Sequence, residues 1–157
     1  EEEHGAVEDA AKKIPVFYSA NMSLGIALLK KLAKEAAAMF PGADIEIVEM
    51  HHRNKLDAPS GTALAIADAV KTVRTDASYV CGRSGFGKRT DSEIGIHAVR
   101  MGSEVGTHEV FFSTGNETVV LRHEAKDRGL FADGALSAAV WLAGQGPGLY
   151  GMEDLLG

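Results

Sequence analysis

The first half of the chain alternates between apolar runs typical of buried strands and patterns typical of helices. The runs Ile14–Ala20 and Ile45–Met50 predict two strands, because each is short and apolar. Helices are expected from Ser23 to about Phe40 and again from Ser60, since serine is favoured at the position that precedes a helix. The first of these helices should cover a sheet face with one apolar stripe, which consists of Leu24, Leu28, Leu32, Ala36 and Met39.

The second half predicts further strands of one sheet. They are expected at Tyr79–Cys81, Ile94–Met101, Val105–Ser113 and Glu117–Glu124. Turn residues separate the last three strands, at Gly102-Ser103-Glu104 and at Thr114-Gly115-Asn116. We therefore expect two hairpins.

Apolar side chains occur on both faces of the predicted middle strands. Val105 and Phe111 fall on one side, and Val110 and Phe112 fall on the other. Since one layer of helices covers only one face, we expect the second face to meet another subunit. The predicted fold class is α+β, with helices on one face of a mixed β-sheet and an oligomer interface on the other.

Both ends of the chain also predict helices. Residues 1–13 begin with acidic residues and end with two lysines, an order that suits the helix dipole. Near the other end, Phe131–Trp141 predicts an amphipathic helix with Leu136, Val140 and Trp141 on its apolar side, and we expect Trp141 to lie in the core. The glycine-rich residues 146–151 are expected to form a loop.

Composition and charge narrow the function classes. The 157 residues are 45% hydrophobic, enough for one good core, and the net charge of -6 argues against general nucleic-acid binding. No apolar run reaches membrane-spanning length, and we expect no signal peptide. Cys81 is the single cysteine, so no disulfide can form within the chain. We expect a cytoplasmic protein whose partner is a small molecule rather than nucleic acid or a membrane.

The densest candidate chemistry lies in residues 46–63. Its polar residues include His51, His52, Lys55, Ser60, Gly61 and Thr62. The first amides of a helix have no partner within it and favour an anion, so we expect Gly61 and Thr62 to hold a carboxylate or phosphate. An imidazole or a lysine beside this pocket can deliver a proton. The segment therefore predicts a site for an acidic small molecule.

Two other interpretations of this segment stay open. In the simplest, Ser60 caps a helix and the histidines are polar loop residues. In the other, a metal ion is held by His51, His52 and either Glu49 or Asp57, although adjacent histidines seldom share an ion. We therefore expect no metal site here.

Three more histidines lie on predicted strands, at His97, His108 and His123. Their positions are separate and their directions opposed, and we expect paired sheet histidines at an interface between subunits. A metal cluster is not expected among them.

Residues 46–63 resemble the signature of 4-hydroxy-tetrahydrodipicolinate reductase, an enzyme family of the diaminopimelate route to lysine. The matching residues are Glu46, Glu49, His51, Lys55, Asp57, Pro59, Ser60, Gly61, Thr62 and Ala63. The resemblance continues through Tyr18–Ser23, Arg100–His108 and Arg128–Leu142, and so covers nearly the whole chain.

The resemblance implies a two-domain protein of which this chain contains the second part. Family members resemble a Rossmann domain followed by a substrate domain, and no Gly-x-Gly-x-x-Gly fingerprint lies between a strand and a helix near the start of this chain. We expect residues 1–22 to be a remnant, one helix and one strand, of the dinucleotide-binding domain with its linker. Residues 23–128 would form the substrate-binding and tetramerisation domain, and residues 129–157 a C-terminal helix and tail that return toward the cofactor domain.

The resemblance also implies roles for individual residues. His51 and Lys55 match catalytic positions. Positions that bind the substrate are matched by His52, Ser60, Gly61 and Thr62. A linker that contacts the nicotinamide end of the cofactor is matched by Ser19, Ala20, Asn21 and Met22, although Met22 stands where a phenylalanine is common.

The implied activity is the reduction of 4-hydroxy-tetrahydrodipicolinate to tetrahydrodipicolinate, with NADPH or NADH as cofactor, in a homotetramer. The alternative is a non-catalytic module that binds dicarboxylates and forms oligomers without reducing anything. We expect this chain alone to bind pyridine-2,6-dicarboxylate, to bind NADH only weakly, and to be inactive without the Rossmann domain.

Overall fold

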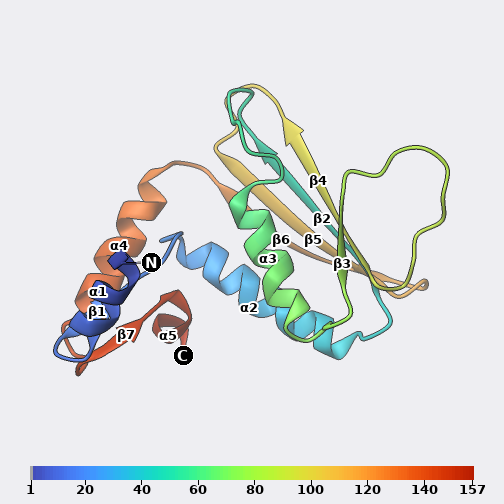
Figure 1. Cartoon of the computed structure of the whole chain (residues 1–157). Coiled ribbons are helices and arrows are strands. Elements are labelled where there is room, and N and C mark those ends of the chain that lie inside the picture. The colour runs from blue at the N-terminus through green and yellow to red at the C-terminus, as the bar shows by residue number, and fades with distance from the viewer. Residues whose placement is uncertain (1) are drawn as a thin grey trace. The chain divides into compact units, whose positions relative to one another are not determined.

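The computed structural model describes residues 2–157, with side chains from His4 onward. It divides into two compact units (Figure 1). The terminal unit contains the residues up to Ala27 together with Arg128–Gly157, and the sheet unit contains Leu28–Asp127. The helices are α1 (Glu2–Ala11), α2 (Leu24–Met39), α3 (Gly61–Lys71), α4 (Gly129–Leu142) and α5 (Met152–Leu156). The strands are β1 (Pro15–Phe17), β2 (Asp44–His51), β3 (Ser78–Cys81), β4 (Glu93–Arg100), β5 (Gly106–Ser113), β6 (Thr118–Ala125) and β7 (Gly148–Tyr150).

The sheet unit is built on five strands in the order β3-β4-β2-β5-β6. The central strand β2 runs parallel to β4 and antiparallel to β5. On the outside, β3 is parallel to β4, and β6 is antiparallel to β5. Helices α2 and α3 lie on one side of this sheet (Figure 1). The predicted α+β class, with helices on one face of a mixed sheet, is confirmed.

One of the two predicted hairpins is wrong. β5 and β6 do form a hairpin, in which the Thr114 amide donates to the Glu117 carbonyl oxygen at 3.0 Å and Gly115 adopts a φ of 91°. By contrast, β4 and β5 are not neighbours, because β2 lies between them. The chain does reverse direction at residues 102–104, but turn residues do not reveal that a third strand is inserted between the two that they join.

The predicted apolar stripe of α2 is also wrong. Leu28, Leu32 and Met39 are exposed, with Met39 at 77%. The buried side of the helix is instead formed by Ile26, Ala27, Leu29, Ala33 and Ala37. The helix is apolar on two sides, and the side rich in small alanines is the one that packs, because small side chains allow a close approach. Its beginning is as predicted, since the Ser23 hydroxyl accepts the Ile26 amide at 3.2 Å.

The sheet face toward the helices changes from apolar to polar along β2. Lateral neighbours at its start and middle are Ile45, Ile94 and Phe112, followed by Ile47, Ile96 and Val110, and all of them are at most 1% exposed. Further along the same face come Glu49 and His51, with His108 beside Glu49. The packed core therefore ends where a buried polar cluster begins.

The terminal unit contains a two-stranded parallel sheet of β1 and β7. The predicted strand Ile14–Ala20 is reduced to three residues, and the glycine-rich segment expected to be a loop supplies its partner strand. Trp141 of α4 packs edge-on against Phe17 and Tyr150, with ring centroids 6.4 and 5.3 Å away. The three aromatic rings join the two short strands to α4.

Helix α4 is close to the linker that precedes α2. A Cβ atom on Gly134 would lie 1.7 Å from the Met22 carbonyl oxygen, so only glycine fits at that position. On the opposite side of α4, Leu136 and Val140 are 67% and 79% exposed. Ala138, four residues after Gly134 and on the same side as Gly134, is buried. Among the described residues no helix combines the length and apolar character needed to cross a bilayer.

Candidate functional site

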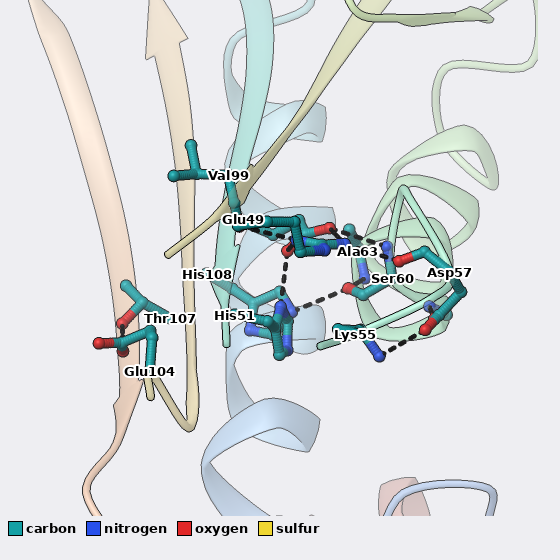
Figure 2. Close-up of polar contacts among 12 residues, drawn as sticks. Glu49, His51, Lys55, Asp57, Ser60, Ala63, Val99, Glu104, Thr107 and His108 are labelled. Atoms are coloured by element: carbon teal, nitrogen blue, oxygen red, sulfur yellow. Dashed lines mark hydrogen bonds and ion pairs between the residues drawn. The ribbon is translucent and has the colours of Figure 1, made fainter. Parts of the chain in front are cut away.

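The polar cluster lies where β2 ends, and it is completed by side chains from the following loop, including Ser60 just before α3, and from β4 and β5. Figure 2 shows Glu49, His51, Ser60 and His108 gathered between the end of β2 and the start of α3. His51 is the last residue of β2 and is 9% exposed, so it is not the polar loop residue of the simplest interpretation.

Glu49 is the centre of this cluster and has no exposed surface. Nη1 and Nη2 of Arg100 donate to it, each at 2.7 Å and each to a different carboxylate oxygen. The Ser60 amide donates to Oε1 at 2.9 Å, and Nδ1 of His51 lies 2.6 Å from Oε2. Burial alone would raise the pKa of Glu49, but the hydrogen bonds from Arg100, His51 and Ser60 outweigh it and leave the pKa lowered. Glu49 is therefore ionised at neutral pH.

Ser60 joins α3 to the histidines. Its hydroxyl accepts the Ala63 amide at 3.1 Å, as expected for the residue that precedes a helix. The same oxygen lies 3.2 Å from Nε2 of His108. The His108 ring packs edge-on against the His51 ring, with centroids 5.1 Å apart. One serine thus anchors the helix and fixes the imidazole next to His51.

The strand histidines include one pair, as predicted, at His108 and His123, so these two are not separate. His108 and His123 are partners in the β5–β6 register and lie on the helix-covered face, whereas His97 lies on the opposite face and contacts Glu46. Burial lowers the pKa of His108 to about 4 and also lowers the pKa of His123. Nδ1 of each is buried and has no hydrogen-bond partner among the described residues. The alternation of a strand gives the face of each residue, but not which strands become neighbours.

The predicted anion pocket already holds a carboxylate of the chain itself. Lys55 Nζ lies 2.8 Å from Asp57, and the Gly61 amide donates to Asp57 at 3.3 Å. The expectation that the Gly61 amide is free is therefore wrong. Asp57 is 56% exposed, and the hydrogen bond from Lys55 is the main cause of its lowered pKa. These groups form a cationic and N–H-rich position suited to a carboxylate.

The Lys55–Asp57 pair is joined to the Glu49 cluster. Arg100 donates to the Asp57 carbonyl oxygen at 2.6 Å as well as to Glu49. The loop of predicted site residues is thereby tied to the end of β4. Figure 2 shows the Lys55–Asp57 contact beside Ser60.

The other predicted substrate residues lie in the same loop and first helical turn. His52 is half-buried, and its carbonyl oxygen accepts the Lys55 amide at 3.1 Å. Thr62 is half-buried in the first turn of α3. Both are near the cluster in the chain, and their roles in binding stay predictions.

The four predicted cofactor residues lie in the terminal unit, in the linker before α2. The Ser19 hydroxyl donates to the Asn21 carbonyl oxygen at 2.7 Å, and Oδ1 of Asn21 accepts the Ser23 amide at 2.9 Å. Ala20 is exposed, and the Met22 side chain is half-buried. The linker is a turn ordered by its own side chains.

Sequence reasoning missed Arg100 and His108 as members of the site, although both fall in a segment of recognised resemblance. Arg100 ends a predicted strand and His108 lies inside another, and nothing in either pattern indicates that both strands flank β2. A signal did exist for Glu49, because it falls in the buried register of Ile45 and Ile47. A charged residue at a buried strand position needs dedicated partners. In the described part of the chain, no group of three or more histidine, cysteine or acidic residues is arranged to hold a metal ion.

Comparison with known proteins gives a consistent result. The family model described as dihydrodipicolinate reductase, C-terminus, matches residues 25–156. The chain is 56% identical to a 4-hydroxy-tetrahydrodipicolinate reductase from Caldanaerobacter subterraneus subsp. tengcongensis, over 99% of this chain and 63% of that protein. Identity to the reductase of Clostridium novyi is 47%, over 96% of this chain and 60% of that protein. The dipicolinate-bound dihydrodipicolinate reductase from Paenisporosarcina sp. TG-14 superimposes with a TM-score of 0.79 at 29% identity, over 98% of this chain and 60% of that one. The chain thus spans about three fifths of the length of these relatives.

Proposed function

The chain belongs to the dihydrodipicolinate reductase family, and we propose that it carries the substrate site of a 4-hydroxy-tetrahydrodipicolinate reductase that uses NADPH or NADH. In this proposal residues 23–128 bind the substrate. Residues 1–22 and 129–157 belong with the dinucleotide-binding part, a division supported by the packing of the two ends into one terminal unit. The cytoplasmic location stays a prediction.

The observation that carries this proposal is the carboxylate position next to His51. Lys55 and the Gly61 amide already hold the Asp57 carboxylate, so the same groups have the charge and geometry to hold a carboxylate of a ligand. A ligand carboxylate would displace the Asp57 carboxylate, which is 56% exposed and so can move out into solvent. His52, Ser60 and Thr62 are proposed to complete the contacts to the dicarboxylate.

The proposed chemistry consumes one hydride and one proton and releases the 4-hydroxyl group as water. The nicotinamide supplies the hydride when it is bound. The residues of this chain supply the rest: His51 is proposed to deliver the proton, and Lys55 to bind the substrate and assist the proton transfer. The His51 ring is largely shielded from solvent, at 9% exposed, and lower exposure to water strengthens its interactions with a bound anion.

The Ser19–Met22 linker fits a contact with a flat ring. Its turn is held by the hydrogen bonds of Ser19 and Asn21, and Ala20 at the exposed tip has too small a side chain to block the approach. We therefore assign Ser19, Ala20, Asn21 and Met22 to the nicotinamide end of the cofactor.

We also propose a homotetramer. The sheet face opposite α2 and α3 carries the apolar side chains of Val48, Met50, Val99, Phe111 and Val120 (Figure 1). Val120 is 47% exposed. Burial of this apolar face against other copies would be favourable. Sedimentation at micromolar concentration should give the mass of a tetramer, and a monomer would contradict this part of the proposal.

The activity is tested by turnover of the intact gene product with 4-hydroxy-tetrahydrodipicolinate and each cofactor. We expect oxidation of NADPH or NADH to follow the substrate. His51→Gln should lower kcat by about 10²- to 10⁴-fold and leave KM within several-fold. Unchanged turnover would remove His51 from the role. Tight dicarboxylate binding without turnover by either cofactor would favour the non-catalytic binding module.

A further inference from the structure

Glu49 accepts four hydrogen bonds in a fully buried position. Each of its two oxygens accepts two donors, so all of the accepting positions of an ionised carboxylate are filled. A fully buried carboxylate is costly unless it is paired in this way. Three of the four donors belong to Arg100 and to the Ser60 backbone, and they hold the carboxylate in one orientation. The fourth is His51.

This orientation determines which nitrogen of His51 can exchange a proton. An ionised carboxylate only accepts hydrogen bonds, and Oε2 of Glu49 is 2.6 Å from Nδ1 of His51. Nδ1 must therefore carry a hydrogen whether the imidazole is neutral or charged. Any proton that His51 gives or takes passes through Nε2.

The Nε2 side of the ring faces a residue that has no side chain. Gly106 of β5 lies beside His51, because its neighbour Thr107 pairs with Met50 in the β2–β5 register. A Cβ atom on Gly106 would lie 3.0 Å from Nε2 and 3.3 Å from Cδ2 of His51. Gly106 is buried and its φ is not positive, so close approach to His51 is the reason for a glycine there.

We propose that Glu49 and Gly106 are positioning residues for His51: Glu49 keeps the hydrogen on Nδ1, and Gly106 leaves Nε2 open as the single atom for proton exchange. The role in proton exchange rests on the proposed function, whereas the arrangement of the ring does not. Glu49 acts through His51 and is not itself placed against a substrate. Arg100 supports the arrangement by holding Glu49.

Glu49→Gln tests the role of Glu49, because the NH₂ group of the glutamine must replace one of the two carboxylate oxygens, and each of these accepts hydrogen bonds. At the Oε1 position the NH₂ would face two donors, Arg100 and the Ser60 amide; at the Oε2 position it would face one fixed donor, Arg100, and the imidazole. The second orientation is favoured, since His51 can move its hydrogen to Nε2 and accept at Nδ1. The variant should therefore reverse the tautomer of the neutral His51 ring.

The experiment is a ¹⁵N–¹H correlation spectrum of the imidazole rings of this chain. Neutral wild-type His51 should carry its hydrogen on Nδ1, and Glu49→Gln should move it to Nε2. Glu46→Gln is the matched control, because Glu46 lies on the same strand and contacts His97 on the opposite face. It should change the His97 signals and leave those of His51 unchanged. A merely structural role for Glu49 would not reverse a tautomer.

Gly106→Ala separates the second half of the proposal from the first. The added methyl group should displace the His51 ring and weaken the binding of pyridine-2,6-dicarboxylate about tenfold or more, while Nδ1 keeps its hydrogen. If the neutral His51 ring of the wild type carries its hydrogen on Nε2, the proposal is overturned even if Glu49→Gln fails to fold. An unchanged dicarboxylate affinity in Gly106→Ala would overturn the role of Gly106. Failure of wild type to bind any dicarboxylate would instead contradict the proposed function and leave the tautomer result standing.

Discussion

The stability of the sheet unit should fall between pH 7 and pH 5 because of His108. This imidazole is 4% exposed, and burial lowers its pKa from 6.5 to about 4. Between these two values the unfolded chain binds a proton at His108 and the folded chain does not. The free energy of unfolding therefore decreases as the pH falls from 6.5 toward 4. Protonation of His108 in the unfolded chain costs no stability only above about pH 6.5.

The size of the effect follows from the difference between the two pKa values. One unit corresponds to about 1.4 kcal/mol, so the contribution of His108 at pH 5 is about 2 kcal/mol and near pH 4 it is about 3 kcal/mol. At pH 7 it is close to zero. His108→Gln removes the titrating group, and its amide can still reach the Ser60 hydroxyl. The loss of unfolding free energy between pH 7 and pH 5 should thus be about 2 kcal/mol smaller in the variant than in wild type.

The assay is urea denaturation at both pH values, followed by far-ultraviolet circular dichroism and by the amide signals of β5. Trp141 fluorescence is not suitable, because Trp141 lies in the terminal unit and His108 in the sheet unit. Val110→Ala is the matched control: it removes a fully buried side chain from the same face of β5 without a titrating group, so its cost should be the same at both pH values. Equal pH dependence in wild type and His108→Gln would refute the reasoning.

Two further substitutions test the packing around the candidate residues. Arg100→Met removes both guanidinium hydrogen bonds from the buried Glu49 carboxylate and should cost about 3 to 5 kcal/mol in urea denaturation, because the charge stays buried without its partner. Arg83→Met breaks an ion pair nearer the surface and should cost much less; equal costs would contradict the account. Gly134→Ala places a methyl group against a backbone carbonyl oxygen and should destabilise the terminal unit by about 1 to 3 kcal/mol, measured by tryptophan fluorescence. Gly144→Ala is the control and should have little effect, because a Cβ atom there would make only an ordinary van der Waals contact. If Gly134→Ala is as stable as Gly144→Ala, α4 does not pack as described.

The sequence predicted the main elements because their signals are local. The Ser60 cap, the β2 strand and the four other strands of the sheet each depend on a few consecutive residues. The order of the strands depends on which surfaces bury one another, and no local pattern records that β2 lies between β4 and β5. For the same reason the sequence predicts a loop where the short strand β7 forms after Pro147.

The candidate site shows the same limit. His51, Lys55, Ser60 and Gly61 were found because they crowd one short segment whose residue types suit anion binding. Arg100 and His108 were not assigned to the site, since they reach it from other strands. The Gly61 amide was expected to be free, but Asp57, four residues earlier, occupies it. A carboxylate so near in the chain competes for the position that a ligand would take.

The most direct test of the account is a ¹⁵N NMR titration of this chain with pyridine-2,6-dicarboxylate. We expect saturable shifts of the amides at the start of α3 and of the His51 ring signals, together with release of the Asp57 carboxylate from Lys55. Lys55→Met should weaken this binding about tenfold or more, because it removes a charged hydrogen-bond donor. Shifts confined to residues away from the end of β2, or no binding at millimolar ligand, would contradict the claim that this loop and helix form a dicarboxylate site.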